Sequence, residues 1–406
     1  MTAVDAGRIG RDIECIAAFS ETEAAVGHSR PTFSPSWARA REYVMQQARD
    51  AGCEIRVDAA GNVHARRPPL GWEAPAWLCG SHIDSVPTGG RFDGVTGVVT
   101  ALEVLRAAPG APVELIVFAE EEGTTFGLGM LGSKAWAGSL DAERLSAVKN
   151  AQGQSFLEAG AGYGVDPARL AAERLSPSRY RGLVEVHVEQ GASMWRNRIP
   201  LAVVTAINGR RQYRCSLTGA ANHAGSTTME DRRDALAGAA EILRYLESLA
   251  YDLADGTPGT VITVGRIEVH PNAINVIAGR AAFSIDFRSP SEAVLGRGEQ
   301  RLLARLPKLA GARGLGIHLQ QTEMLPVVPM DAAVCARLRE AAGRLGVSLP
   351  DAASGALHDS AIIAPLLPTA MLFVASKDGI SHNPAEESRV QDIELAARVL
   401  AEAFQP

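Results

Sequence analysis

The stretch AWLCGSHIDSVPTGGRFDGVTGVVTALEVLRAA, residues 76–108, decides the fold. It opens with an apolar run ending in His82 and Asp84, turns through a glycine-rich loop, and continues from Gly94 as a helical pattern of apolar residues. A second apolar run, PVELIVFA, follows at residues 112–119. Strand, helix and strand in this order predict an α/β fold, a sheet layered between helices.

The pattern changes between residues 209 and 323. We expect six elements there: a strand at 211–219, a helix at 229–253, strands at 260–270 and 280–289, a helix at 293–309 and a strand at 314–321. This β-α-β-β-α-β order is typical of a ferredoxin-like module. We therefore predict one domain formed by residues 1–208 and 324–406, with residues 209–323 inserted into it as a second domain.

Composition excludes several classes of protein. The 40 Lys and Arg against 46 Asp and Glu give a net charge of −6 without a basic stripe, which argues against nucleic acid as a partner. With 46% hydrophobic and 21% charged residues, the chain is neither disordered nor fibrous. Its longest apolar runs fall far short of the roughly 20 residues that a membrane span requires. Charges within the first 23 residues argue against a signal peptide, so we expect a cytoplasmic protein.

The five cysteines are scattered and form no CxxC pair, so we expect buried free thiols. Four histidines lie outside any cluster of polar residues, and we assign them no role: His28, His64, His270 and His318.

Polar side chains follow the first two expected strands. His82 and Asp84 end the first, and the glycine-rich loop then returns Asp93. Three carboxylates, Glu120 to Glu122, end the second. Taken alone, each cluster has a simpler interpretation. His82 would be an ordinary loop histidine, and the three glutamates would be a run of surface charge. Ligands of open α/β sheets nevertheless collect beyond the carboxyl ends of strands, which favours a joint site.

Two further segments carry histidines. In LVEVHVEQG, residues 183–191, alternation places Glu185, His187 and Glu189 on one face of a strand, where they would serve equally well as solvent-facing residues. In GISHNPAE, residues 379–386, His382 lies in a loop after the apolar run PTAMLFVA.

Taken together, these segments supply five nitrogen and oxygen ligands without a thiolate, a set suited to Zn²⁺, Mn²⁺ or Co²⁺: His82, Asp93, Glu122, His187 and His382. Five ligands exceed the needs of one catalytic zinc, but with a bridging carboxylate they fit two metals about 3.5–4 Å apart. Glu121, beside a ligand, is the expected general base. Asp84 is the expected carboxylate that orients His82.

Seven motifs in order carry a family resemblance: GSHIDSVPTGGRFDG, FAEEEGTTFG, VEVHVEQG, NHAGSTTMEDRRDAL, PNAINVIAG, DFRSP and GISHNPAE. From about residue 18 onward the chain resembles N-carbamoyl-L-amino acid hydrolases, allantoate amidohydrolases and β-ureidopropionases, amidases of the dinuclear-metal aminopeptidase and aminoacylase superfamily. The resemblance implies a zinc-aminopeptidase-like catalytic domain with a mixed sheet and an inserted ferredoxin-like lid that also forms a homodimer. It implies hydrolysis of an N-carbamoyl-L-amino acid, a small carboxylate-bearing substrate, with two divalent ions (Zn, Mn, Co or Ni) per subunit.

The resemblance also implies roles for residues. His82 and His187 match ligands of one metal, Glu122 and His382 ligands of the other, and Asp93 the bridge between them, while Glu121 matches the catalytic base. In the lid, His223 matches a group that polarises the scissile carbonyl, Asn275 and Arg288 match groups that hold the substrate carboxylate, and Gln190 in the catalytic domain matches a further substrate contact. From the residues alone, Arg288 equally suits a structural pair with Asp286, His223 an exposed histidine and Asn275 a turn cap.

Two positions depart from the family pattern. Leu357 replaces a glycine in the pocket motif, giving SGALHDSA, and Thr228 replaces a proline in HAGSTTM. Both leave the metal set intact and bear on which substrate fits. The alternatives are therefore an allantoate, ureidoglycolate or β-ureidopropionate amidohydrolase, and an aminoacylase or dipeptidase acting on an N-acyl group. A metal-free binding protein on the same fold is disfavoured because all five ligands and the base are present.

Overall fold

The computed structural model describes residues 3–405. The chain divides into two compact units. The first comprises Met1–Thr205, Met330–Ala352 and Leu357–Pro406, and the second comprises Ala206–Pro329 and Ala353–Ala356. The second unit is therefore inserted into the chain of the first.

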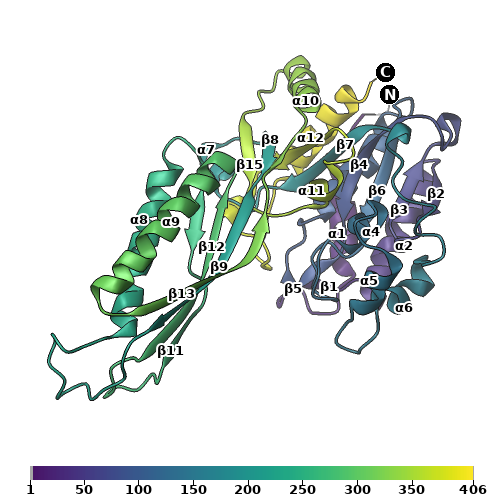
Figure 1. Ribbon diagram of the computed structural model, residues 1–406. Helices are drawn as coiled ribbons and strands as arrows, with labels where there is room; N and C mark the ends of the chain where they lie inside the picture. Colours follow the sequence, from purple (N-terminus) through teal and green to yellow (C-terminus); the bar gives the residue numbers. More distant parts are fainter. Residues whose placement is uncertain (1–2, 406) are drawn as a thin grey trace. The chain divides into compact units, whose positions relative to one another are not determined.

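A large mixed sheet runs in the order β14-β8-β16-β7-β4-β6-β3-β2, with β15 beside β8 (Figure 1). Its strands are β2 Glu54–Val57, β3 Val63–Arg66, β4 Ala76–His82, β6 Val113–Phe118, β7 Tyr180–Val188, β8 Leu201–Ile207, β14 Val328–Pro329, β15 Asp351–Ser354 and β16 Thr369–Val374. The four central neighbours β16, β7, β4 and β6 are parallel, whereas β3 and β8 pair antiparallel on either side of them. Because parallel neighbours end at the same edge, this order decides which side chains meet.

Helices pack against this sheet, as the α/β prediction requires. Helix α3 contacts β4, β6 and β7 and also packs on α1 and α12, while α11 contacts α4, β7 and β16. The helices outside the inserted segment are α1 Ala6–Ala18, α2 Pro35–Asp50, α3 Val95–Ala107, α4 Leu131–Trp136, α5 Ala142–Ala147, α6 Phe156–Gly160, α7 Ser193–Asn197, α10 Ala332–Arg344, α11 Asp359–Ile363 and α12 Val390–Ala403. Every residue of β4, β6 and β16 is buried, which explains why these strands are continuous apolar runs.

The second unit holds a separate antiparallel sheet in the order β10-β12-β9-β13, with β11 also beside β12. Its elements are β9 Gly209–Thr218, α8 Ala235–Ala254, β10 Val261–Thr263, β11 Ile267–His270, β12 Arg280–Ser289, α9 Glu292–Ala312 and β13 Gly316–Leu325. Alternate residues of β9 and β12 are buried in a core with α8 and α9. The opposite face of this sheet carries polar side chains. The ferredoxin-like order is confirmed, and with it the fold class.

Some elements differ from their sequence-based expectations. Helix α8 begins at Ala235 rather than at Met229, because the Asp234 side chain accepts the N–H groups of Leu236 and Ala237 and caps the helix there. The single strand expected over residues 260–270 is interrupted and forms β10 and β11. Residues 85–89, expected as loop, form β5 (Ser85–Gly89) against β1 (His28–Arg30).

Four cysteines are buried and free, but Cys15 is exposed, so the expectation of buried thiols is wrong at that position. Of the helices in residues 3–405, none combines the length and the apolar character needed to cross a membrane.

Candidate active site

Four adjacent parallel strands deliver polar side chains to one edge of the large sheet. His82 is the last residue of β4 and His187 the second-last of β7. Glu121 and Glu122 follow β6, and His382 follows β16 after the short helix η4 (Lys377–Gly379). The convergence follows from the strand order, since segments far apart in the chain end beside one another.

The carboxylate of Asp93 lies between two groups of potential metal ligands. Its Oδ1 is 3.1 Å from Nε2 of His187 and 3.6 Å from Nε2 of His82. Its Oδ2 is 3.3 Å from Nε2 of His382, which in turn is 3.5 Å from Oε1 of Glu122. Within each triplet, the ligand atoms all lie within 4.8 Å of one another. Asp93 is thus shared by the two triplets, one oxygen to each.

The donor atoms of these residues suit divalent cations. Nδ1 of His82 and Nδ1 of His187 each lie 3.0 Å from a backbone carbonyl oxygen, of Asp84 and Val188 respectively. A hydrogen bond at this position fixes the proton on Nδ1 and leaves the Nε2 lone pair available as a ligand. Oε1 of Glu122 is buried and has no hydrogen-bond partner among the described residues. An all nitrogen-and-oxygen set of this kind fits a pair of divalent ions.

The carboxylate of Asp84 lies close to His82 and makes its hydrogen bond elsewhere. Its Oδ1 is 3.7 Å from His82 Nδ1, farther than the backbone carbonyl of the same residue, and its Oδ2 accepts the backbone N–H of Glu122 at 3.1 Å. Asp84 therefore touches both sides of the site, His82 through its carbonyl and Glu122 through its carboxylate.

Adjacent glutamates occupy different surroundings. Glu120 has a left-handed backbone with φ of 54°, and its Oε1 accepts the N–H groups of Thr125 and Phe126, which closes the turn after β6. Glu121 belongs to neither triplet, and its Oε2 is 3.8 Å from His82 Nε2. A carboxylate that lies beside the ligands without joining them suits a general base.

The site concentrates negative charge in a buried place. Burial raises the pKa of Glu122 to about 7, and the charge of Asp93 acts in the same direction. Burial raises the pKa of Glu121 well above its ordinary value, with Glu122 adding to the effect and His82 opposing it. Burial alone would raise the pKa of Asp93, but the facing histidines, His187 foremost, hold it well below its ordinary value. Such crowding favours a bound cation.

Two further predicted residues lie in the first unit. Gln190 adopts a left-handed backbone with φ of 56°, and its Nε2 donates to Asp93 Oδ2 at 2.8 Å. Leu357 is partly exposed and precedes the buried His358, whose ring centre is 4.4 Å from that of His187.

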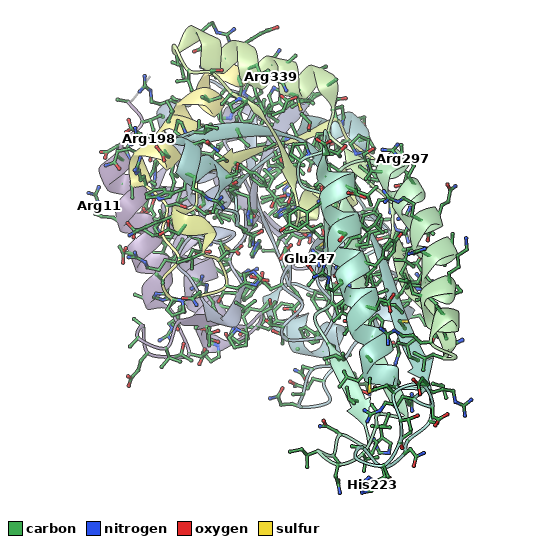
Figure 2. All side chains as sticks on the ribbon, turned by 90° about the vertical axis from the view of Figure 1, so that its left-hand side faces the viewer. Arg11, Arg198, His223, Glu247, Arg297 and Arg339 are labelled. Atoms are coloured by element: carbon green, nitrogen blue, oxygen red, sulfur yellow. The ribbon has the colours of Figure 1, made fainter. Side chains whose placement is uncertain are left out.

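The remaining predicted residues lie in the second unit. His223 is exposed, on the loops at one end of that unit (Figure 2), and its Nδ1 accepts the N–H of Gly225 at 3.0 Å. The backbone carbonyl of Asn275 accepts the N–H of Ala224, so the two loops adjoin. Arg288 lies on β12 and is paired with Asp286. The catalytic roles of these three residues remain predictions.

Comparison with known proteins places this geometry in a family. Residues 78–405 match the family described as Peptidase family M20/M25/M40. The chain belongs to the M20 family. Across 401 residues it is 36% identical to an N-carbamoyl-L-amino-acid amidohydrolase of Paenarthrobacter aurescens, covering 97% of this chain and 96% of that protein. It is 34% identical over 386 residues to an allantoate amidohydrolase of Escherichia coli, covering 93% and 92%.

A solved structure agrees with the sequence comparison. An amidase of the hydantoinase/carbamoylase family from Burkholderia multivorans superposes with a TM-score of 0.92 at 36% identity, covering 99% of this chain and 97% of that one. This M20 protein is therefore a hydrolase of the hydantoinase/carbamoylase amidohydrolase subfamily, and that family membership implies a dinuclear metal site and small-molecule substrates.

Sequence reasoning passed over one buried carboxylate of this M20 site, Glu386. Its two oxygens accept hydrogen bonds from the loop of Asp93 and from Ser381, the neighbour of His382. The signal that could have found it is Gly90, where a Cβ atom would lie 2.2 Å from a Glu386 oxygen. A glycine there leaves room for the glutamate, but nothing local in the sequence links the two positions.

A second buried network, also not anticipated, lies beside the ligands. Glu185 accepts hydrogen bonds from Ser81 Oγ at 2.8 Å and from Ser360 N and Oγ at 3.0 and 2.6 Å. Ser81 is next to His82 on β4, and Glu185 is two residues before His187 on β7. This network therefore ties β4, β7 and α11 together directly behind the two potential ligands.

Proposed function

We propose that this M20 amidohydrolase cleaves the ureido C–N bond of an N-carbamoyl-L-amino acid, giving the amino acid, ammonia and carbon dioxide. The observation that carries the proposal is the sharing of Asp93 between two ligand triplets, His82 with His187 and Glu122 with His382. The relative from P. aurescens supports the choice of substrate class, because it is an N-carbamoyl-L-amino-acid amidohydrolase that matches over nearly the whole chain.

The two triplets would each hold one divalent ion, drawn from Zn, Mn, Co or Ni. When bound, such a pair activates water for attack and stabilises negative charge on the carbonyl oxygen of the substrate. The backbone carbonyls of Asp84 and Val188 fix the ring orientations of His82 and His187. The carboxylate of Asp84 holds the backbone of Glu122.

Glu121 would handle the proton. Its carboxylate lies beside the ligand set, at 3.8 Å from His82 Nε2, and would take a proton from the attacking water and pass it to the departing nitrogen. In the second unit, the proposed lid, His223 would polarise the scissile carbonyl. Arg288 and Asn275 would hold the substrate carboxylate, so that binding energy away from the reacting carbon positions it. Gln190 would add a contact from the first unit.

The substrate alternative with support of its own is allantoate. The E. coli relative is an allantoate amidohydrolase, and its identity of 34% is close to the 36% of the carbamoylase. Leu357 distinguishes this chain from the glycine-containing pocket motif of the family, and a larger side chain there would restrict the groups that fit beside His358.

We further propose that the protein is a homodimer and that the second unit forms its interface. A sedimentation measurement of the molecular mass would test whether the protein is a dimer.

The test of the proposed function is ammonia release by metal-stripped protein reconstituted separately with Mn²⁺, Co²⁺, Zn²⁺ and Ni²⁺. The substrate panel contains N-carbamoyl, N-formyl and N-acetyl L-amino acids together with allantoate, and amino-acid release is followed in parallel. We expect metal-dependent ammonia from an N-carbamoyl-L-amino acid. Amino acid released without ammonia from acyl substrates would make the protein an aminoacylase, and ammonia from allantoate alone would select the allantoate alternative.

A further inference from the structure

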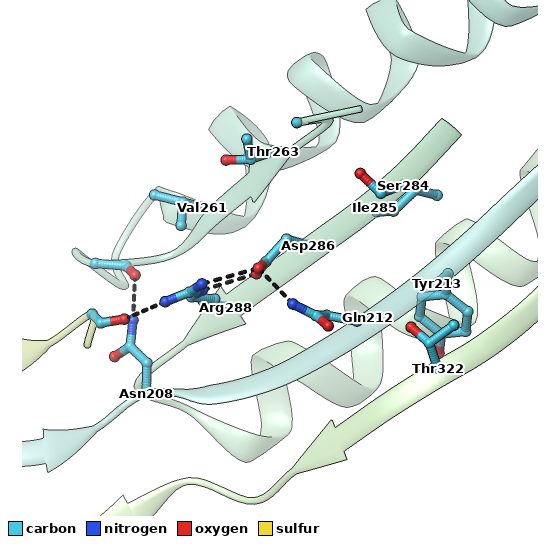
Figure 3. A pocket seen from close by; sticks show the side chains of 13 residues that line it. Asn208, Gln212, Tyr213, Val261, Thr263, Ser284, Ile285, Asp286, Arg288 and Thr322 are labelled. Atoms are coloured by element: carbon cyan, nitrogen blue, oxygen red, sulfur yellow. Dashed lines mark hydrogen bonds and ion pairs between the residues drawn. The ribbon is translucent and has the colours of Figure 1, made fainter. Parts of the chain in front are cut away.

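The polar face of the second unit's sheet carries a cavity of about 550 Å³ (Figure 3). Side chains from β9, β10, β12 and β13 line it, Gln212, Thr263, Asp286, Arg288 and Thr322 among them. All the residues that line the cavity belong to this unit.

The carboxylate of Asp286 accepts two hydrogen bonds from one edge of the Arg288 guanidinium. Nε of Arg288 donates to Oδ1 of Asp286 at 2.9 Å, and Nη2 donates to Oδ2 at 3.0 Å. Gln212, directly opposite Asp286 on β9, donates from Nε2 to the same Oδ2 at 2.9 Å. Burial alone would raise the pKa of Asp286, but these two partners outweigh it and lower the pKa. The carboxylate is therefore ionised and held from two sides.

The remaining donors of Arg288 define what it can bind. Nη1 donates to the backbone carbonyl of Gly355 at 2.8 Å, in addition to the two bonds to Asp286. A guanidinium has five N–H groups. Three of them are engaged in these bonds, which leaves one N–H on each terminal nitrogen without a hydrogen-bond partner among residues 3–405. These are the donors that Arg288 can offer to a planar carboxylate.

The charge around this fork is balanced. Asp286 compensates Arg288, and Arg210, which stands opposite Arg288 on β9, is compensated by Glu323 at 2.5 Å. The cavity thus attracts one carboxylate through hydrogen-bond geometry and offers no surplus positive charge. Because Arg288 is already paired, a second carboxylate on the same ligand would find no free positive charge in this cavity, and its approach to Asp286 would disfavour binding.

We propose that Asp286 is a positioning and specificity-determining residue, which presents the Arg288 fork to a single carboxylate and selects monocarboxylate over dicarboxylate substrates. This inference rests on the proposed function, in which Arg288 receives the substrate carboxylate. It extends that function by naming the class of side chain that is accepted: an uncharged one, as in N-carbamoyl-L-alanine, in preference to an acidic one, as in N-carbamoyl-L-aspartate.

The test compares these two substrates in the metal-loaded enzyme and its Asp286→Asn variant. The substitution keeps the size of the side chain while removing its charge and one acceptor. We expect KM for N-carbamoyl-L-alanine to rise about tenfold with a smaller change in kcat, because a contact made equally in ground and transition states affects KM. The ratio of kcat/KM for the aspartate derivative to that for the alanine derivative should rise about tenfold, since a repelling charge is gone.

A matched control is Glu268→Gln on β11 of the same sheet, which removes the carboxylate that pairs with Arg266. Neither Glu268 nor Arg266 lines this cavity. The control variant should leave the ratio unchanged. Gln212→Leu, which frees Asp286 without changing the charge, should raise KM for the alanine derivative and leave the ratio near that of the wild type. Equal losses on both substrates in Asp286→Asn would overturn the proposal by reducing Asp286 to a structural residue. If Asp286→Asn does not fold, a Gln212→Leu protein with unchanged KM overturns it.

Calorimetric binding separates this inference from the proposed function. Both ligands are titrated into metal-loaded Glu121→Gln protein, with and without Asp286→Asn. If the wild type hydrolyses no N-carbamoyl-L-amino acid of the substrate panel but the binding ratio shifts as expected, the proposed reaction fails and the selectivity stands. If the wild type hydrolyses the alanine derivative and neither ratio shifts, the selectivity fails alone. Absence of binding by both ligands overturns both.

Discussion

The carboxylate of Glu386 accepts the backbone N–H of Asp93 at 3.0 Å, across 293 positions of the chain. The same oxygen accepts the N–H of Phe92 at 2.8 Å, and the other accepts Ser381 Oγ at 2.8 Å. Ser381 Oγ also lies 3.0 Å from Oδ2 of Asp93. A side chain that belongs to neither candidate triplet thus connects the loop of Asp93 to the loop of His382.

This arrangement predicts that Glu386→Ala weakens metal binding. Without its acceptor, the backbone of Asp93 loses the contact that orients its carboxylate, and residues that orient ligands typically contribute about 10- to 100-fold in metal affinity. The measurement is a competition titration of the metal-stripped protein against a chelator, with circular dichroism to verify folding.

The control for this prediction is the next residue. Glu387 is exposed and pairs with Lys377 at 2.5 Å, so Glu387→Ala removes a carboxylate from the same loop without touching Asp93. Its metal affinity should equal that of the wild type. Identical affinities for the two alanine variants would show that Glu386 does not support the ligand.

The division of Asp93 between two triplets predicts separable metal sites. His187→Ala and His382→Ala each damage one triplet, so each protein should retain about one metal per chain where the wild type retains about two. Asp93→Ala damages both and should retain neither. Elemental analysis after dialysis against a low concentration of chelator measures this. Loss of both metals from either histidine variant would contradict independent triplets.

The sequence predicted the part of this site that depends on strand ends. His82, Glu122 and His187 stand at or just beyond the ends of apolar runs, and apolar runs of that length are buried parallel strands, so their meeting at one edge followed from the pattern. The ferredoxin-like order of the inserted unit was equally visible, because alternation in β9 and β12 differs from the continuous runs of the large sheet.

What the sequence did not predict depends on contacts between distant segments. Nothing near Glu386 indicates that it is buried against Asp93, and nothing near residues 85–89 indicates that they pair with β1. The start of α8 was misplaced because the polar stretch before Asp234 is compatible with a helix, and only the cap at that aspartate ends the ambiguity. Side-chain direction was also hidden: Nδ1 of His82 bonds the carbonyl of Asp84 rather than its carboxylate.

The surroundings of His64, which belongs to neither candidate metal triplet, predict that the stability of the fold depends on pH. Its Nδ1 lies 2.8 Å from Glu114 Oε1 and its Nε2 3.3 Å from Asp58 Oδ2. Burial alone would lower the pKa of His64, but these carboxylates outweigh it and raise the pKa from 6.5 to about 9. A raised pKa in the folded state means that the protonated ring stabilises the fold fully below about pH 6.5 and that this contribution is lost as pH rises through about 9.

The corresponding variant is His64→Gln. Its free energy of unfolding should fall below that of the wild type by roughly 3 kcal/mol at pH 6, and the deficit should shrink by pH 10. Denaturant unfolding of both proteins at the two pH values measures this. His318→Gln, at an exposed position on β13, is the control and should match the wild type at both. A deficit that is the same at pH 6 and pH 10 would rule out protonation as the source.

Glu121→Gln tests the division of labour between metal binding and proton transfer. Glu121 belongs to neither triplet and its Oε2 lies 3.8 Å from His82 Nε2, so the amide should leave both metals bound. A glutamine cannot accept the proton of the attacking water, and loss of a general base typically lowers the rate by about 10²- to 10⁴-fold. Elemental analysis and turnover are measured on the same preparation, with Glu122→Gln as the contrasting variant that should lose a metal. Full turnover by a Glu121→Gln protein that carries both metals would transfer the role of base to another group.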